Sequence, residues 1–344
     1  MAVQDIKDYV ELGEPSGRGN VLAIQPFVRP ADYTSEGAFS LRMNGYLDEA
    51  RQRGWVTDRT VAVFPEYVGA WLVALGEGVG VYRAKSVASA MGALARAHPV
   101  GFIGRWLGAG ARDRTRAALF RLKAEQMAAV YQATFSTLAR TYAVSIVAGS
   151  IVLPAPTLVG GRLEAGEGPL TNVAVVYRSD GAAVALSRKV YPTADEVGWI
   201  APGRLEDLPV VNTGSGRMGV LVCADAWYPE PYRVLEEKGA EIVAVPSFLP
   251  GDDVWGRPWR GYSGQPAPDD VDAGDVDVID EGEAWIKYGM IGRIDASGAT
   301  CGVNVFLRGS LWDLGSDGCT MVVLDEDTYR TERVAGAALV NVWL

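Results

Sequence analysis

The sequence predicts an α/β protein with much of its sheet buried. Short runs rich in β-branched residues recur along the chain, and longer segments of helical character separate them. Two of these runs, Val61–Phe64 and Gly219–Val222, are continuously apolar, as expected of strands that are covered on both faces. Because strands alternate with helical segments along the chain, the α/β class is expected.

The individual elements follow from the same pattern. Strands are expected at 21–27, 60–64, 144–152, 172–177, 183–189, 218–223, 242–247, 300–307, 320–324 and 338–343. Helices are expected between them, among others at 40–53, 114–142 and 231–238. No internal repeat or dividing linker is evident, and 344 residues suffice for a substantial core. Residues 1–344 are therefore predicted to form one domain.

Two segments differ from the rest of the chain in charge. Nine basic residues lie between Arg83 and Lys123, with Asp113 as the one acidic residue among them. From this charge pattern, a basic helical insertion is predicted at about 76–113. The second segment, at about 250–283, has ten acidic and two basic residues and is rich in Pro and Gly. A long loop is expected there, and loops of such length are usually functional or mobile.

The histidine and cysteine content restricts the chemistry. His98 is the one histidine, so a multi-histidine metal site is excluded, and any Ser–His–Asp apparatus would have to use this residue. The three cysteines have no short paired spacing, so neither a disulfide framework nor a zinc knuckle is expected. Cys301 and Cys319 lie in or beside apolar strands and are expected in the core, whereas Cys223 ends such a strand.

Charge and hydropathy limit partners and location. A formal net charge of −10 argues against nucleic acid as the main partner, because phosphate binding needs a basic surface. The N-terminal residues contain no apolar core of signal-peptide length, and no uncharged apolar run approaches the ~20 residues of a membrane span. A cytoplasmic location is therefore expected.

Three chemically active side chains follow predicted strands directly. Glu66 comes after the strand at 60–64, Lys189 ends the strand at 183–189, and Cys223 ends the strand at 218–223. Strand ends line the crevice in which ligands bind in α/β sheets. A thiol nucleophile, a carboxylate that accepts its proton and an ammonium that stabilises negative charge would form a nucleophilic centre without histidine.

Each of these residues also has a structural interpretation. A cysteine at the end of a buried strand is most often a small core residue. Glu66 would equally serve to cap a following helix, and Lys189 would serve as a solvated strand end. When each residue is considered alone, a structural role is favoured for all three. The motifs around the three residues shift the preference to a catalytic role.

The motifs around these residues resemble those of the nitrilase (carbon–nitrogen hydrolase) superfamily. The segment 220–230 contains Cys-x-Asp-x-x-x-Pro-Glu and is similar to the nucleophile motif of that family. The segment 63–66 (Val-Phe-Pro-Glu) resembles its glutamate motif, and 187–192 (Ser-Arg-Lys-Val-Tyr-Pro) resembles its lysine motif. Ala148–Ser150 and Asn172 also match, and the similarity extends from Val21 to the final strand. Three motifs in the right order and spacing are a specific signal.

This resemblance implies a fold, a mechanism and an assembly. The fold would be a four-layer αββα sandwich of the nitrilase type, in a homodimer or higher homo-oligomer, with neither metal nor organic cofactor. Cys223 would be the nucleophile and Glu66 the general base. Lys189 and the backbone N–H of Ala224 would stabilise the oxyanion. Glu196 would be a substrate-positioning residue that also orients Lys189, although a surface-loop carboxylate is the alternative.

The residues after the nucleophile indicate the branch. Cys223–Asp225 resembles the amidase and carbamoylase branches more than the nitrilases proper, which usually follow their cysteine with Trp-Glu. The predicted reaction is hydrolysis of a non-peptide carbon–nitrogen bond in a small amide or N-carbamoyl substrate, through a thioester. Nitrile hydrolysis or acyl transfer by the same triad, and a non-catalytic binding protein on this fold, remain open as alternatives.

Some features depart from the family pattern. Of the family's Arg-Ala-x-Glu signature, 293–296 keeps only the arginine. The acidic loop is longer than usual; it is expected to be solvated, and close enough to the nucleophile to overhang the pocket. The apolar patch at 99–107 of the insertion favours an oligomer contact or a pocket lid over contact with a membrane surface. His98 is expected to be structural. An apolar pocket is expected to include Trp71, Trp199 and Trp227.

Overall fold

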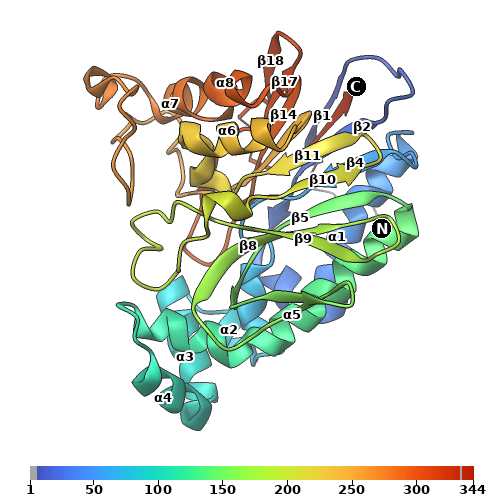
Figure 1. Ribbon diagram of the computed structural model, residues 1–344. Helices are drawn as coiled ribbons and strands as arrows, with labels where there is room; N and C mark the ends of the chain where they lie inside the picture. The colour runs from blue at the N-terminus through green and yellow to red at the C-terminus, as the bar shows by residue number, and fades with distance from the viewer. Residues whose placement is uncertain (1–5, 334) are drawn as a thin grey trace.

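Two β-sheets lie face to face at the centre of the protein, and helices cover the outer face of each (Figure 1). The structure is a computed structural model that describes residues 6–333 and 335–344. From the bottom of Figure 1 to the top, the layers are helices, the larger sheet, the smaller sheet and a second set of helices. The α/β class predicted from the sequence and the four-layer αββα sandwich implied by the resemblance are both confirmed.

The larger sheet has seven strands, with parallel pairs in its middle and antiparallel pairs toward one edge. β2, β4 and β5 run parallel, so Glu66, which follows β4, lies where their carboxyl ends meet. In spatial order the strands are β1 (Ile6–Leu12), β19 (Ala337–Trp343), β2 (Asn20–Gln25), β4 (Thr60–Val63), β5 (Ser145–Pro154), β8 (Leu170–Tyr177) and β9 (Ala183–Arg188).

The smaller sheet has six strands, and its three central strands are parallel. Cys223 follows one of these, β11, so the smaller sheet contributes the thiol while the larger one contributes the glutamate. In order the strands are β10 (Val210–Thr213), β11 (Gly216–Val220), β12 (Ile242–Ser247), β14 (Cys301–Phe306), β17 (Met321–Leu324) and β18 (Asp327–Arg330).

The apolar residues of each strand divide between two layers because successive side chains point to opposite faces. In β4, Val61 and Val63 face the smaller sheet, whereas Ala62, together with Phe64 directly after the strand, packs with the helices that cover the larger sheet. The two continuously apolar runs of the sequence are thus explained by burial on both faces. Cys301 and Cys319 are buried in the core, as predicted.

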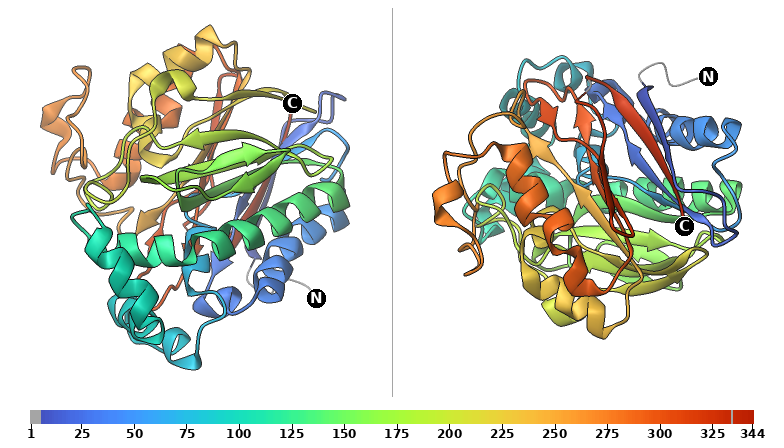
Figure 2. Two further views of the ribbon diagram at one scale, coloured as in Figure 1. Left: turned by 60° about the horizontal axis from the view of Figure 1, so that its bottom comes forward. Right: turned by 90° about the horizontal axis from the view of Figure 1, so that it is seen from above.

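The covering helices are of very different lengths. α1 (Glu36–Gln52) and the long α5 (Arg114–Tyr142) lie on the larger sheet, and Figure 2 shows α5 running alongside its strands. α6 (Pro229–Glu237), α7 (Glu281–Tyr288) and α8 (Met290–Arg293) lie on the smaller sheet (Figure 1). α1 begins four residues before its predicted start because Ser35 caps it, accepting a hydrogen bond from the backbone N–H of Ala38 at 3.1 Å.

Three short helices lie beside the N-terminal half of α5. They are α2 (Val79–Tyr82), α3 (Val87–Ala97) and α4 (Pro99–Gly108), at the lower left of Figure 1. Val100, Ile103 and Leu107 on α4 are exposed. His98, between α3 and α4, lies 2.9 Å from the Glu77 carboxylate, outside the cavity described below. In the described part of the chain, no helix combines the length and the apolar character needed to cross a membrane.

Candidate active site

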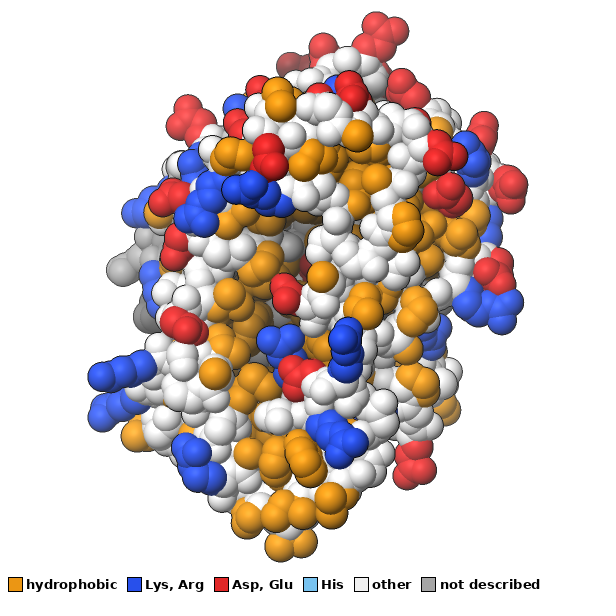
Figure 3. All heavy atoms as spheres, turned by 90° about the vertical axis from the view of Figure 1, so that its left-hand side faces the viewer, with side chains coloured by type: hydrophobic (Ala, Val, Ile, Leu, Met, Phe, Trp, Pro, Cys, Tyr) orange, Lys and Arg blue, Asp and Glu red, His pale blue; other side chains and the backbone are white. Residues whose placement is uncertain are grey.

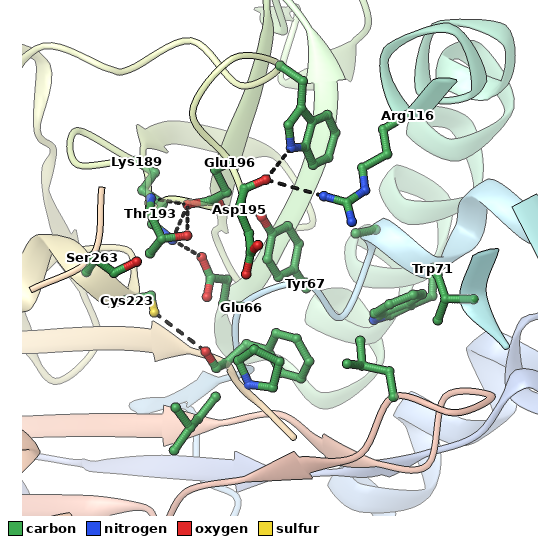
Figure 4. A pocket seen from close by; sticks show the side chains of 18 of the residues that line it. Glu66, Tyr67, Trp71, Arg116, Lys189, Thr193, Asp195, Glu196, Cys223 and Ser263 are labelled. Carbon is green, nitrogen blue, oxygen red and sulfur yellow. Dashed lines mark hydrogen bonds and ion pairs between the residues drawn. The ribbon is translucent and has the colours of Figure 1, made fainter. Parts of the chain in front are cut away.

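Cys223 occupies a sharp turn at the end of a buried strand. β11 ends at Val220, and Cys223 begins the short 3-10 helix η4 (Cys223–Trp227). The φ angle of Cys223 is +51°, a left-handed conformation that non-glycine residues adopt at an energetic cost. The thiol is 5% exposed, and Sγ lies 3.8 Å from the carbonyl oxygen of Phe248 (Figure 4).

Asp225 joins the two segments that carry Cys223 and Lys189. One of its carboxylate oxygens accepts backbone N–H bonds from Val190 and Tyr191, both at 2.8 Å, and the other accepts the N–H of Val222 at 3.1 Å. Burial raises the pKa of Asp225 to about 7, although the N–H of Tyr191 and the charge of Lys189 act in the opposite direction. The sequence motif contains this aspartate, but its clamping role is visible only in the structure.

Glu66 is positioned by the neighbouring strand β5. The N–H of Ser150 donates to the carbonyl of Pro65 at 3.2 Å, and the N–H of Tyr67 donates to Oγ of Ser150 at 2.8 Å. Gly149 has a φ of +70°, and a Cβ there would lie 2.0 Å from the Pro65 oxygen. Only glycine therefore permits the close approach that fixes Glu66.

Lys189 lies between two carboxylates. Its Nζ is 2.8 Å from Oε1 of Glu66 and 2.7 Å from Oε2 of Glu196, and all three side chains are almost fully buried. The Asn172 amide donates to Glu66 at 2.8 Å and to Glu196 at 2.9 Å, and the Tyr67 hydroxyl donates to Glu196. Figure 4 shows Glu66, Lys189 and Glu196 grouped beside Cys223. The structure thus brings the predicted residues together, and Lys189 is not a solvated strand end.

The pKa values of the cluster reflect the balance between burial and charge. Burial raises the pKa of Glu66 above its usual value, even though the ammonium of Lys189 and a hydrogen bond with the Cys223 thiol oppose this. Burial also disfavours ionised Glu196, but the charge and hydrogen bond of Lys189 prevail and lower its pKa. Burial acts against charged Lys189 as well, and the carboxylates Glu196 and Glu66 outweigh it, so its pKa is raised. Lys189 therefore remains an ammonium.

The thiol of Cys223 is neutral in the resting site. Burial raises its pKa well above the usual value, and the negative charge of Glu66 adds to this effect while Lys189 opposes it. A reaction that uses the thiolate must therefore remove the proton as the sulfur attacks. Glu66, which has a raised pKa and lines the same cavity as the thiol, is suited to accept that proton.

The side chains of Cys223, Glu66, Lys189 and Glu196 line a cavity of about 430 Å³. The face that Figure 3 shows is hollowed, and hydrophobic side chains surround the hollow. Ala224, whose backbone N–H follows the thiol, is part of the cavity wall, and so are Trp71, Trp199 and Trp227. The predicted apolar pocket is confirmed for all three tryptophans.

The acidic segment supplies aromatic side chains that sequence reasoning missed. Trp259 and Tyr262 line the cavity and pack on Trp227, with ring centroids 5.9 and 5.5 Å from it. Trp285 of α7 stands against the same ring at 4.8 Å. The acidic residues, Pro and Gly of this segment led to the prediction of a solvated loop. The aromatic residues inside the segment were the overlooked signal that it forms a wall of the pocket.

Residues 293–296 keep only the arginine of the family's Arg-Ala-x-Glu signature, and the structure shows what this arginine binds. Arg293 is buried and hydrogen-bonds both carboxylate oxygens of Asp270, at 2.7 and 3.1 Å, and the backbone carbonyl of Tyr288 at 2.9 Å. The carboxylate partner of Arg293 thus comes from the acidic segment. Among the described residues, no group of three or more His, Cys, Asp or Glu side chains is arranged to hold a metal ion.

Glu281, at the start of α7, lines the cavity without a cationic partner among the described residues. It accepts a hydrogen bond from Nε1 of Trp285 at 3.1 Å, and burial raises its pKa from 4.5 to about 7. Between these two pH values the unfolded chain releases a proton that the folded protein keeps, so stability falls as pH rises. We expect Glu281→Gln to raise the melting temperature increasingly from pH 4.5 to pH 7, and by a constant amount above.

Thermal melts across this pH range measure the effect. Glu237→Gln, which removes the same charge from an exposed site on α6, is the matched control and should show no such gain. A melting-temperature difference between Glu281→Gln and wild type that stays constant with pH would contradict the prediction.

Comparison with known proteins finds a family model and several relatives that match this chain. Residues 57–265 match the family model for carbon-nitrogen hydrolases. The N-carbamoylputrescine amidase of Solanum tuberosum is 30% identical over 106 residues, which are 27% of this chain and 35% of that protein. The deaminated glutathione amidase of Synechocystis sp. is 30% identical over 149 residues, 39% of this chain and 52% of that protein. The chain thus spans between a third and about half of the length of these relatives.

Solved structures share the fold over nearly the whole chain. A variant of an amidase of the nitrilase superfamily from Nesterenkonia sp. AN1 superposes with a TM-score of 0.59 and covers 96% of this chain and 92% of that one. The sequence identity is 16%, so the likeness concerns the fold alone.

Proposed function

Because the chain belongs to the carbon–nitrogen hydrolase family, we propose that it hydrolyses a non-peptide carbon–nitrogen bond in a small amide or N-carbamoyl compound. One observation carries this proposal: Lys189 is held between the buried carboxylates of Glu66 and Glu196, and Cys223 lies beside them in a cavity open to a small molecule. The amidases among the relatives support an amide over a nitrile.

The first half of the reaction forms a thioester. Glu66 takes the proton of the Cys223 thiol as Sγ attacks the carbonyl carbon of the substrate. The carbonyl oxygen becomes an oxyanion, which the Lys189 ammonium and the backbone N–H of Ala224 stabilise. Glu66 then donates its proton to the nitrogen, the carbon–nitrogen bond breaks, and ammonia or an amine departs. The acyl group remains on Sγ.

The second half returns the enzyme to its starting state. Glu66 removes a proton from a water molecule as the oxygen attacks the thioester carbon. The resulting oxyanion uses the same two donors, and its collapse expels Sγ, which regains a proton from Glu66. Glu196 acts as a positioning residue, because its bonds to Lys189, Asn172 and Tyr67 fix the ammonium against Glu66. All these steps use groups of the chain itself.

Ammonia release is the test of this proposal. Primary amides of different size, N-carbamoyl amines and nitriles are incubated with wild type and with Cys223→Ala, and ammonia is measured. We expect release from amides or carbamoyl compounds in wild type and none above background in the variant. Release from nitriles alone would overturn the amide assignment. No release from any compound by the folded protein would overturn hydrolysis and favour acyl transfer or a binding role.

A further inference from the structure

The cavity extends beyond the catalytic side chains into a region that we call the distal arm. In Figure 4, Trp71 and Arg116 lie on the opposite side of the cavity from Lys189 and Cys223. The side chains of the arm come from the segment after Glu66, from α2 and α3, from α5 and from the loop after β15 (Arg308–Gly309), and all of them are apolar. They include Trp71, Val81, Ala90, Leu94, Leu119 and Trp312.

The charges of the basic segment do not enter the arm. Arg83, Lys85 and Arg96 flank α3 or lie on it, and all three are exposed and absent from the cavity wall. Arg116, at the edge of the arm, is held by Asp113 at 3.3 Å and by the carbonyl of Asp195 at 3.3 Å. The wall that α3 presents is therefore uncharged in the most basic part of the chain, and a charged substituent would lose its hydration there without an opposite charge to compensate.

The arm is fixed by hydrogen bonds between distant parts of the chain. Nε1 of Trp312 donates to the carbonyl of Val81 at 2.8 Å, and the N–H of Val87 donates to Asp313 at 2.8 Å. The Tyr82 hydroxyl donates to the carbonyl of Ala74 at 2.5 Å. α2 and α3 are thus tied to the loop after β15 on one side and to the segment after Glu66 on the other. A preformed apolar cavity binds an apolar group without the cost of ordering its walls.

We propose that the substrate carries an extended alkyl or arylalkyl chain that occupies the distal arm while its carbon–nitrogen bond lies against Cys223. This inference rests on the proposed hydrolase function and specifies its substrate class. The cavity of about 430 Å³ would hold on the order of ten groups the size of a water molecule, far more than acetamide fills. Each methylene that moves from water into the arm is expected to raise kcat/KM about fourfold.

Two homologous series of amides test the proposal. They also show whether the alkyl chain of the substrate lies on the acyl side or on the amine side of the carbon–nitrogen bond. Acetamide, butyramide, hexanamide, octanamide and decanamide lengthen the acyl side, and the N-alkyl acetamides lengthen the amine side. We expect kcat/KM to rise with chain length in one series and then to level when the arm is full. A flat or falling kcat/KM in both series would overturn the proposal.

Substitutions in α3 test whether the alkyl chain of the substrate lies in the distal arm. Ala90 is buried in the wall, and Ala90→Phe should lower the ratio of kcat/KM for the longest to the shortest substrate by more than about tenfold, roughly the contribution of two methylenes. Ala88→Phe, on the exposed side of the same helix, is the matched control and should leave the ratio unchanged. Leu94→Ala enlarges the arm and should move the levelling point to longer chains. An unchanged chain-length profile in both Ala90→Phe and Leu94→Ala would contradict the assignment.

Binding to Cys223→Ala separates this inference from the proposed function. Calorimetric titration with decanamide and with acetamide measures affinity without turnover, and decanamide should bind more tightly. Turnover by wild type without any dependence on chain length would support the hydrolase and overturn the inference. Tight binding of decanamide without turnover of any amide by wild type would support the arm and overturn the proposed function.

Discussion

Replacement of Cys223 by alanine is expected to abolish amide turnover, lowering kcat/KM by on the order of 10⁶-fold, the scale seen when an enzyme nucleophile is removed. The loss follows because Sγ forms the bond to the acyl group, and no other cysteine of the described chain lines the cavity. The fold should persist, since alanine is smaller and the side chain at this site is already buried. Steady-state kinetics and circular dichroism measure the two effects.

A covalent intermediate gives an independent readout. Wild type quenched in acid during turnover should show an added acyl mass on the peptide that contains Cys223, and the alanine variant should not. Cys319→Ala makes the same chemical change at a buried cysteine outside the cavity and is the matched control. Turnover in Cys223→Ala equal to that of wild type would refute the thioester mechanism.

Lys189→Met should be the most destabilising substitution in the site. It removes the ammonium that lies 2.8 Å from Glu66 and 2.7 Å from Glu196, and leaves two buried carboxylates without a cation. Removing one partner of a buried ion pair typically costs about 3–5 kcal/mol of unfolding free energy. Activity should disappear as well, because the oxyanion loses its charged donor. Chemical denaturation and ammonia release measure the two losses.

The destabilisation should depend on pH in a defined direction. In wild type the pKa of Glu196 is lowered, so its stabilising contribution is present above the ordinary value of 4.5 and is lost as pH falls. Without Lys189, burial raises the pKa of both carboxylates, and their ionisation then costs stability as pH increases. The difference in unfolding free energy between wild type and Lys189→Met should therefore be large at pH 7 and small at pH 4.

A triple variant separates the two roles of Lys189. Adding Glu66→Gln and Glu196→Gln to Lys189→Met removes the uncompensated charges while it preserves the shape of the cluster. Most of the unfolding free energy should return, and activity should not. If Lys189→Met is as stable as wild type at pH 7, the ion-pair account of the cluster is wrong.

Local sequence patterns predicted much of the fold. Every strand expected from a continuous apolar run coincides with a strand of the structure, because burial on both faces requires such a run. Within the two large sheets, the strands that were missed are β1, β10 and β18, which lie at the sheet edges. Edge strands such as Asp327–Arg330 tolerate polar residues, so they carry no apolar run by which to find them. The short helices α2–α4 were predicted only as one helical insertion, because short segments with apolar residues on exposed as well as buried faces show no clear helical period.

By itself, the sequence determined which residues carry the proposed chemistry: Glu66, Lys189, Cys223 and Glu196 stand in short motifs whose order and spacing are specific. Only the tertiary structure decided what surrounds them. The clamp of Asp225 and the carboxylate that Asp270 offers to Arg293 join segments far apart in the chain.

The distal arm is the clearest case of this difference. One of its fixing bonds joins Val81 to Trp312, which are 231 positions apart. A strand or a helix leaves a period in the sequence because its own geometry turns side chains toward the same face at regular intervals along the chain. The walls of a cavity come from many elements that meet only when the sheets pack, so no local pattern records them. The residues of the proposed reaction can therefore be predicted from sequence motifs, whereas the shape and polarity of the pocket arise from the packing of the folded chain.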